Sequence, residues 1–129
     1  MSAGMLEHVN VTVSDPDRTA RLLCDLFGWR VRWQGPSKMG GHTVHVGTDD
    51  AYVAVYTHPK TGNGDGIEPG LRWGGLNHVG VLVEDLDAVE QRIHAAGIET
   101  FNHGDYEPGR RFYFNDPDGI EFEVVSYAG

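Results

Sequence analysis

Cysteine, basic residues and long apolar segments are all scarce in this chain of 129 residues. Its one cysteine, Cys24, excludes an internal disulfide, and no signal peptide or membrane-length apolar run is visible, so we expect a cytoplasmic protein. Ten lysines and arginines stand against 19 acidic residues, which gives a formal net charge of −9. Nucleic acids and anionic membranes both require a basic patch, so we expect neither as a partner. A small-molecule partner is left open.

What is present is one pattern that occurs twice. Residues 6–13 alternate as in a half-buried strand, with His8 and Asn10 on the polar face. A helix is expected from Asp15-Pro16 to about Gly28, with Cys24 on its buried side, because Asp caps helices and Pro fits their first turn. Strand-like segments follow at 29–34, 42–48 and 52–57. The order then restarts, and His78, Asp85 and Gly97 follow His8, Asp15 and Gly28 at offsets of 70, 70 and 69 residues.

This internal repeat predicts the fold class. Two copies of a βαβββ pattern indicate an α+β protein, with module 1 at about 5–58 and module 2 at about 76–127. The second module contributes strand-like segments at 98–102, 110–115 and 120–127. Residues 59–75 are rich in Gly and Pro and are expected to link the modules within a single domain, 1–129. We expect the paired modules to form an incomplete eight-stranded barrel around a metal cavity.

The end of the second module predicts a hairpin that carries a carboxylate. Asp116-Pro117-Asp118-Gly119 has the composition of a tight turn. On both sides of it, aromatic or aliphatic residues alternate with polar ones, so Glu123 shares a face with Glu121, opposite the apolar residues. A carboxylate in the middle of a strand requires a partner.

Histidines at equivalent positions of the two modules offer that partner. His8 and His78 both lie opposite the apolar stripes of the two first strands, and with Glu123 they compose a 2-His-1-carboxylate set. Such a set suits Fe(II), Mn(II), Zn(II) or Ni(II) and leaves coordination positions open for substrate. The alternative is that each histidine is a hydrogen-bonded sheet residue and that Glu123 is simply exposed. The repeat places Ala54 at the position of Glu123, so we expect three protein ligands and no fourth.

These residues resemble the vicinal oxygen chelate superfamily, which includes glyoxalase I, extradiol dioxygenases, fosfomycin thiol transferases and bleomycin-resistance proteins. The resemblance covers nearly the whole chain and rests on five markers: Leu-Glu-His8-Val, Asp15-Pro16, Phe27-Gly28-Trp29, Asn-His78-Val-Gly-Val, and Asp116-Pro-Asp-Gly with Glu123. It implies a shared fold and a divalent metal that chelates adjacent substrate oxygens, with chemistry that varies between members.

Within this superfamily, Ala54 favours extradiol-dioxygenase-like chemistry. Glyoxalase I enzymes resembling this chain carry a metal-binding Glu or Gln at that position, whereas extradiol dioxygenases and fosfomycin thiol transferases use three ligands. Tyr113 matches a substrate-binding Tyr of extradiol enzymes, and His103 lies close to the place of their acid–base His. We therefore expect Tyr113 and His103 to be catalytic, and Tyr56, Arg111 and Asn10 to contact substrate.

The resemblance leaves other functions open. The metal is expected to be Fe(II), with Mn, Ni, Co or Zn as alternatives. A glyoxalase-type lyase, an isomerase or a thiol transferase would use the same site. A third alternative is a non-catalytic protein that sequesters a drug, like the bleomycin-resistance proteins. By analogy we expect a homodimer, with each site built within one chain or shared between two.

Overall fold

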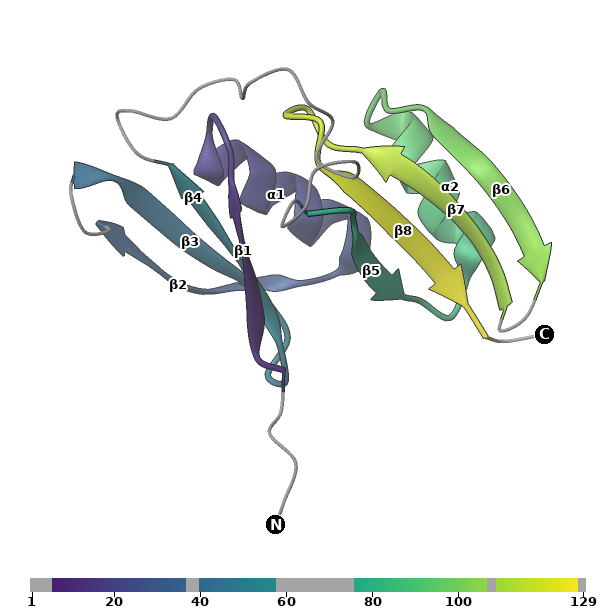
Figure 1. The fold of residues 1–129 in the computed structure, drawn as a ribbon, viewed down its shortest axis with the longest axis horizontal. Coiled ribbons are helices and arrows are strands. Elements are labelled where there is room, and N and C mark those ends of the chain that lie inside the picture. The colour runs from purple at the N-terminus through teal and green to yellow at the C-terminus, as the bar shows by residue number, and fades with distance from the viewer. Residues whose placement is uncertain (1–5, 37–39, 58–75, 107–108, 128–129) are drawn as a thin grey trace, which may run out of the picture. The chain divides into compact units, whose positions relative to one another are not determined.

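The fold of the computed structural model is described for residues 6–36, 40–57, 76–106 and 109–127. The chain divides into two compact units, 1–62 and 63–129. Both contain one helix and a four-stranded sheet in the order of a βαβββ module, which confirms the predicted α+β class (Figure 1). The predicted linker 59–75 lies outside the described residues, and the closure of the two modules into a barrel stays a prediction.

The first unit contains β1 (His8–Thr12), α1 (Pro16–Phe27), β2 (Arg30–Pro36), β3 (His42–Gly47) and β4 (Tyr52–Thr57). Its strands are ordered β1-β4-β3-β2, with β1 parallel to β4 and the other pairs antiparallel. Asp15 caps α1 by accepting a hydrogen bond from the Arg18 N–H, and Pro16 opens the helix. Gly28 ends it at φ 71°, a left-handed conformation that glycine adopts without steric cost.

The second unit contains β5 (Val79–Leu82), α2 (Leu86–Ala95), β6 (Thr100–Tyr106), β7 (Gly109–Asn115) and β8 (Glu121–Ser126). The strand order β5-β8-β7-β6 repeats that of the first unit, again with the first and last strands parallel. Asp85 caps α2 through the Ala88 N–H, and Gly97 follows the helix at φ 82°. The predicted helix boundaries are therefore confirmed in both modules.

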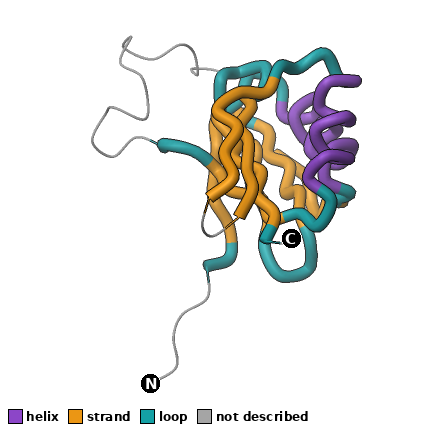
Figure 2. Tube along the Cα trace, turned by 90° about the vertical axis from the view of Figure 1, so that its right-hand side faces the viewer, coloured by secondary structure: helices purple, strands orange, loops and turns teal. Residues whose placement is uncertain are grey.

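In each unit the helix packs on one face of its own sheet and the core lies between them (Figure 2). In the first unit, Leu23 and Leu26 of α1 are buried with Val44, Val46 and Val55 of the sheet. In the second unit, the fully buried residues are Ile93, Phe112, Phe114, Phe122 and Val124. These strand residues alternate with residues of the opposite face, which is therefore the face that carries the predicted site in each unit.

Three sequence-based expectations need correction. The strand predicted at 98–102 extends to Tyr106, because an irregularity between Phe101 and Gly104 lets the pairing with β7 resume one residue out of step. Asn102 takes φ 54° there. The first strands of the two modules are shorter than predicted, and Cys24 is only partly buried.

Among the described residues, no helix is long and apolar enough to cross a membrane.

Candidate functional site

The second unit brings His78 and Glu123 together. Because β5 runs parallel to β8, Gly80 pairs with Glu123, and His78 stands two residues before Gly80 on the same side of the chain. The Nε2 atom of His78 lies 3.1 Å from Oε1 of Glu123, and its Nδ1 lies 2.7 Å from Oδ1 of Asn77. The side chain of Glu123 is 13% exposed and that of His78 is 33% exposed, so the pair is accessible from one side.

The chemistry of this pair fits a cation. Asn77 Oδ1 and Glu123 Oε1 both accept hydrogen bonds, so a neutral His78 ring cannot satisfy the two at once. With the proton on Nδ1, the lone pair of Nε2 faces the carboxylate, and a second proton or a metal ion belongs between them. Two adjacent ligands of an octahedral ion bound at about 2.1 Å are about 3 Å apart, which matches the observed separation.

Arg111 and Tyr113 of β7 complete this part of the site. Tyr113 pairs directly with Glu123 across the strands, and its ring meets the His78 ring edge-on at 5.7 Å. Burial, and then the negative charge of Glu123, raise the pKa of Tyr113, so its hydroxyl remains a hydrogen-bond donor at neutral pH. Nη1 of Arg111 lies 2.7 Å from Oε2 of Glu123. The Nε–H of Arg111 is buried and has no hydrogen-bond partner in the described part of the chain.

His8 belongs to the first unit and is oriented in the same manner as His78. Its Nδ1 lies 2.9 Å from Oε1 of Glu7, and this hydrogen bond lowers the pKa of Glu7. The carboxylate only accepts, so Nδ1 of His8 donates this hydrogen bond, and Nε2 is the ring nitrogen that remains for a ligand. The His8 ring stacks on Tyr52 at 4.9 Å, and Tyr52 stacks on His45 at 4.4 Å.

The strand registers support the repeat argument for Ala54. Asn10 pairs with Ala54 as Gly80 pairs with Glu123, so Ala54 occupies the position of the carboxylate in the first unit. Ala54 is buried and carries no donor atom. Asn10 is exposed on the same strand face as His8, and Tyr56 is partly buried beside Thr12. These placements fit a ligand-facing role for Asn10 and Tyr56, which stays a prediction.

His103 does not join the other predicted catalytic residues. Its Nε2 lies 2.6 Å from Oε2 of Glu90, on α2, and its ring contacts the buried Phe112. It therefore lies on the helix-covered side of the sheet, whereas Tyr113 and Glu123 lie on the other side. The irregularity at Asn102 explains this placement, because one extra residue in a strand moves the following side chains to the opposite face.

Four polar residues at or near these positions were not predicted. Glu7 and Asn77 orient the two histidines, His45 lies on the sheet face with Tyr52, and Glu90 binds His103. Burial lowers the pKa of His45, and a positive charge on His8 or Arg32 acts in the same direction, which favours the neutral form of His45. The repeat contained a signal for His45: strand pairing places it opposite Ala54, as it places Tyr113 opposite Glu123.

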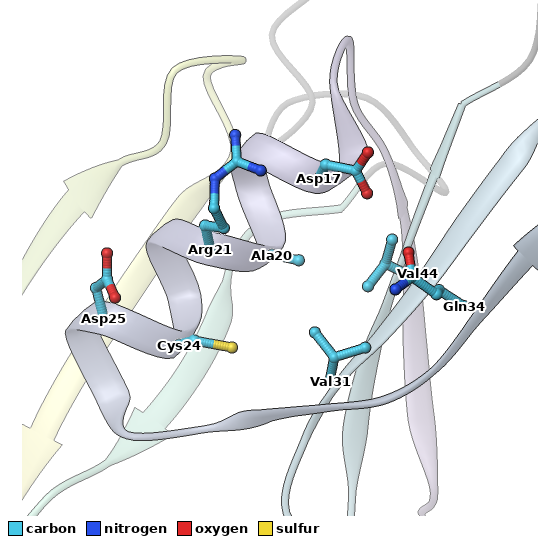
Figure 3. A pocket seen from close by; sticks show the side chains of 8 residues that line it. All are labelled: Asp17, Ala20, Arg21, Cys24, Asp25, Val31, Gln34 and Val44. Carbon is cyan, nitrogen blue, oxygen red and sulfur yellow. The ribbon is translucent and has the colours of Figure 1, made fainter.

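A separate groove of about 410 Å³ lies on the helix side of the first unit, between α1, β2 and β3 (Figure 3). Figure 3 shows the sulfur of Cys24 directed toward the strands. Burial, and then the charge of Asp25, raise the pKa of Cys24, so its thiol is protonated and unreactive at neutral pH. The lining residues are Asp17, Ala20, Arg21, Cys24, Asp25, Val31, Gln34 and Val44.

The described residues include no group of three His, Cys, Asp or Glu side chains that could hold a metal ion. This agrees with the division of the predicted ligands, because His78 and Glu123 lie in one unit and His8 in the other. The place of His8 as a third ligand remains a prediction from the repeat.

Comparison with known proteins identifies the family. The model of the Glyoxalase/Bleomycin resistance protein/Dioxygenase superfamily matches residues 5–124, and the chain belongs to this superfamily. The uncharacterized protein YaeR of Escherichia coli K12 is 22% identical, over 92% of this chain and 93% of that protein.

Solved structures share the fold. A glyoxylase/bleomycin resistance protein/dioxygenase domain from Frankia sp. EAN1pec has a TM-score of 0.79 and 25% identity, covering 97% of this chain and 98% of that chain. The fosfomycin resistance protein FosX of Listeria monocytogenes, in complex with Mn(II) and sulfate, has a TM-score of 0.71 and 21% identity, covering 100% of this chain and 94% of that chain. The expected superfamily is therefore confirmed.

Proposed function

We propose that the chain is a divalent-metal-dependent enzyme whose substrate is a small molecule with two adjacent oxygens. The observation that carries this proposal is the pairing of His78 Nε2 with Glu123 Oε1, while Nδ1 of His78 is bound by Asn77. This arrangement leaves two ligand atoms directed at one point on the exposed side of the sheet. We assign His8 as the third ligand, because Glu7 orients it in the same way.

The metal would act as a Lewis acid that stabilises negative charge on the chelated substrate oxygens. We favour Fe(II), and Mn, Ni, Co and Zn are the alternatives. The nitrogen and carboxylate donors suit all of these ions. FosX, which shares the fold, was crystallised with Mn(II), and this supports a divalent ion.

The roles of the surrounding residues follow from their contacts. Tyr113 keeps its proton, which is hydrogen-bonded to Glu123 in this structure, and would redirect this hydrogen bond to a substrate oxygen. We retain Arg111 as a substrate contact from the second unit, and Asn10 and Tyr56 as substrate contacts from the first unit. We favour His45 over His103 as the group that accepts a proton. The neutral form of His45 is favoured and His45 shares a sheet face with His8, whereas His103 is bound to Glu90.

Among the reactions of this superfamily, we favour extradiol-dioxygenase-like ring cleavage. Ala54 leaves three protein ligands, and Tyr113 adjoins the carboxylate ligand. A lyase, isomerase or thiol transferase that uses the same ions is the second candidate, and the absence of O2 consumption would identify it. The third candidate function is drug sequestration without catalysis. It would be identified by tight binding of an aromatic drug to purified protein that contains no metal.

The test is metal binding followed by an oxygen-uptake screen. Anaerobically purified protein is expected to bind one equivalent of Fe(II) or Mn(II). His78→Ala, His8→Ala and Glu123→Gln should each lose this binding. His94→Ala is the matched control, because His94 is exposed on α2 and should leave binding unchanged. Unchanged metal content in His78→Ala would refute the proposal. With catechols, one O2 consumed per ring opened supports the favoured reaction.

We also propose that the protein is a homodimer. The measurement is light scattering on purified protein, for which a monomer mass at micromolar concentration would be the contrary result. The same sample allows a mixing test of shared sites. Metal binding restored by mixing His8→Ala with Glu123→Gln would indicate that each site draws ligands from two chains.

A further inference from the structure

Arg111 is held in place by more contacts than a surface arginine requires. Its side chain is only 11% exposed. Besides the Glu123 carboxylate, its Nη2 donates to the carbonyl of Gly109 at 3.1 Å and lies 3.5 Å from that of Tyr106. The guanidinium also lies over the Tyr106 ring, 4.5 Å from the ring centroid. These contacts anchor a planar group that has few alternative positions.

The anchored guanidinium holds one oxygen of the Glu123 carboxylate. Oε2 lies 2.7 Å from Nη1 of Arg111, and Oε1 lies 3.1 Å from Nε2 of His78. Each oxygen therefore has a different nitrogen neighbour, and the Tyr113 hydroxyl also hydrogen-bonds this carboxylate. Rotation of the carboxylate would break the charge-assisted bond to Arg111, so Oε1 is the oxygen presented beside the histidine nitrogen.

The repeat offers an internal comparison. By strand pairing, Arg111 lies opposite Val125 of β8, and the equivalent pair in the first unit is Thr43 with Tyr56. The first module, which has Ala54 in place of the carboxylate, thus has Thr43 in place of the arginine. The arginine occurs only in the module that has the carboxylate, as expected if its role is to orient that carboxylate.

We propose that Arg111 is a positioning residue for the metal ligand Glu123. It holds Oε2 so that the carboxylate offers Oε1 alone. This inference rests on the proposed metal site. Electrostatics alone predicts the opposite result. The positive charge of Arg111 would repel a metal ion bound to Glu123, so removing Arg111 would tighten metal binding.

The test measures Mn(II) affinity of the full chain by calorimetry and by electron paramagnetic resonance. Arg111→Met is expected to weaken Mn(II) binding about tenfold or more, as for other residues that orient metal ligands. Arg111→Lys should restore part of the affinity, since an ammonium can still reach Oε2. Arg110→Met is the matched control: Arg110 is exposed on the same strand, pairs with Asp87 and should leave affinity unchanged.

A second variant and a second readout separate positioning from folding. Tyr106→Leu removes the ring under Arg111 at a largely exposed position, and a smaller loss of affinity is expected. At saturating Mn(II), the resonance line shape of Arg111→Met should differ from wild type, whereas a purely structural role would leave it unchanged. Circular dichroism verifies that each variant is folded.

The outcomes distinguish this inference from the proposed function. Mn(II) affinity that is unchanged or tighter in folded Arg111→Met, while His78→Ala loses binding, would overturn the positioning role alone. A wild-type protein that binds no Mn(II) would overturn the proposed metal site and this role with it.

Discussion

The turn between β7 and β8 should depend on Asp116, which is 4% exposed. Its Oδ1 accepts hydrogen bonds from the backbone N–H groups of Asp118, at 2.9 Å, and Ile120, at 2.8 Å. Hydrogen bonds to a charged group contribute about 1.5–3 kcal/mol each, so Asp116→Ala should lower the free energy of unfolding by about 3 kcal/mol or more. This is a large part of the roughly 5–15 kcal/mol typical of a small protein.

Equilibrium unfolding in urea, followed by circular dichroism, measures this loss. Asp116→Asn retains an acceptor oxygen without the charge and should lose less. Asp49→Ala is the control, because Asp49 is 86% exposed in its pair with Arg30 and its replacement should change stability by no more than about 0.5 kcal/mol. An Asp116→Ala protein as stable as Asp49→Ala would show that the Pro-Asp-Gly backbone alone forms the turn, and our reasoning would be wrong.

Two further predictions concern pH and a helix end. Burial by itself would raise the pKa of Glu90, but the hydrogen bonds from Thr100 and His103 lower it overall below its ordinary value of 4.5. A lowered folded-state pKa adds stability above the unfolded-state pKa and loses it as pH falls through the folded value. The stability difference between wild type and Glu90→Gln should thus be largest near neutrality and shrink below about pH 4.5; a constant difference from pH 7 to pH 3.5 would contradict this. Gly28→Ala should lower the free energy of unfolding by about 1 kcal/mol, because φ of residue 28 is 71°. Gly28→Asn should lower it by less. Equal losses would show that the left-handed backbone conformation is not the cause.

The sequence allowed much of the second unit's candidate site to be predicted, because that part depends on local periodicity. His78 and Glu123 each follow from strand alternation, and the repeat offset identified Ala54 as the position without a carboxylate. The registers observed for β1 with β4 and for β5 with β8 agree with that offset. Alternation is a property of neighbouring residues, and the offset is a comparison of two parts of the sequence, so both can be identified without knowing how the chain packs.

The position of His103 could not be predicted in this way. It depends on one residue, Asn102, that takes a left-handed conformation and shifts the register of β6. Asn tolerates that conformation better than most residues but does not require it. An unmarked shift of one residue reverses the face of every following side chain, so the sequence did not indicate on which face of the sheet His103 lies.

Glu7 and Asn77 could not be predicted for a different reason. A residue next to a strand histidine is expected to point to the opposite face. Glu7 lies just before β1 and Asn77 lies before β5, outside the paired residues of both strands, so their side chains are not bound to alternate. The side chains turn back to their own neighbouring rings, which no sequence pattern indicates.

The difference between Glu7 and Asn77 makes the two histidines electronically unequal. Glu7 backs the His8 ring with a full negative charge, whereas Asn77 backs the His78 ring with a neutral amide. A carboxylate behind an imidazole increases its electron donation. The two modules thus differ in the group that supports the equivalent histidine. In the proposed metal site, the His8 ring would therefore be the stronger donor.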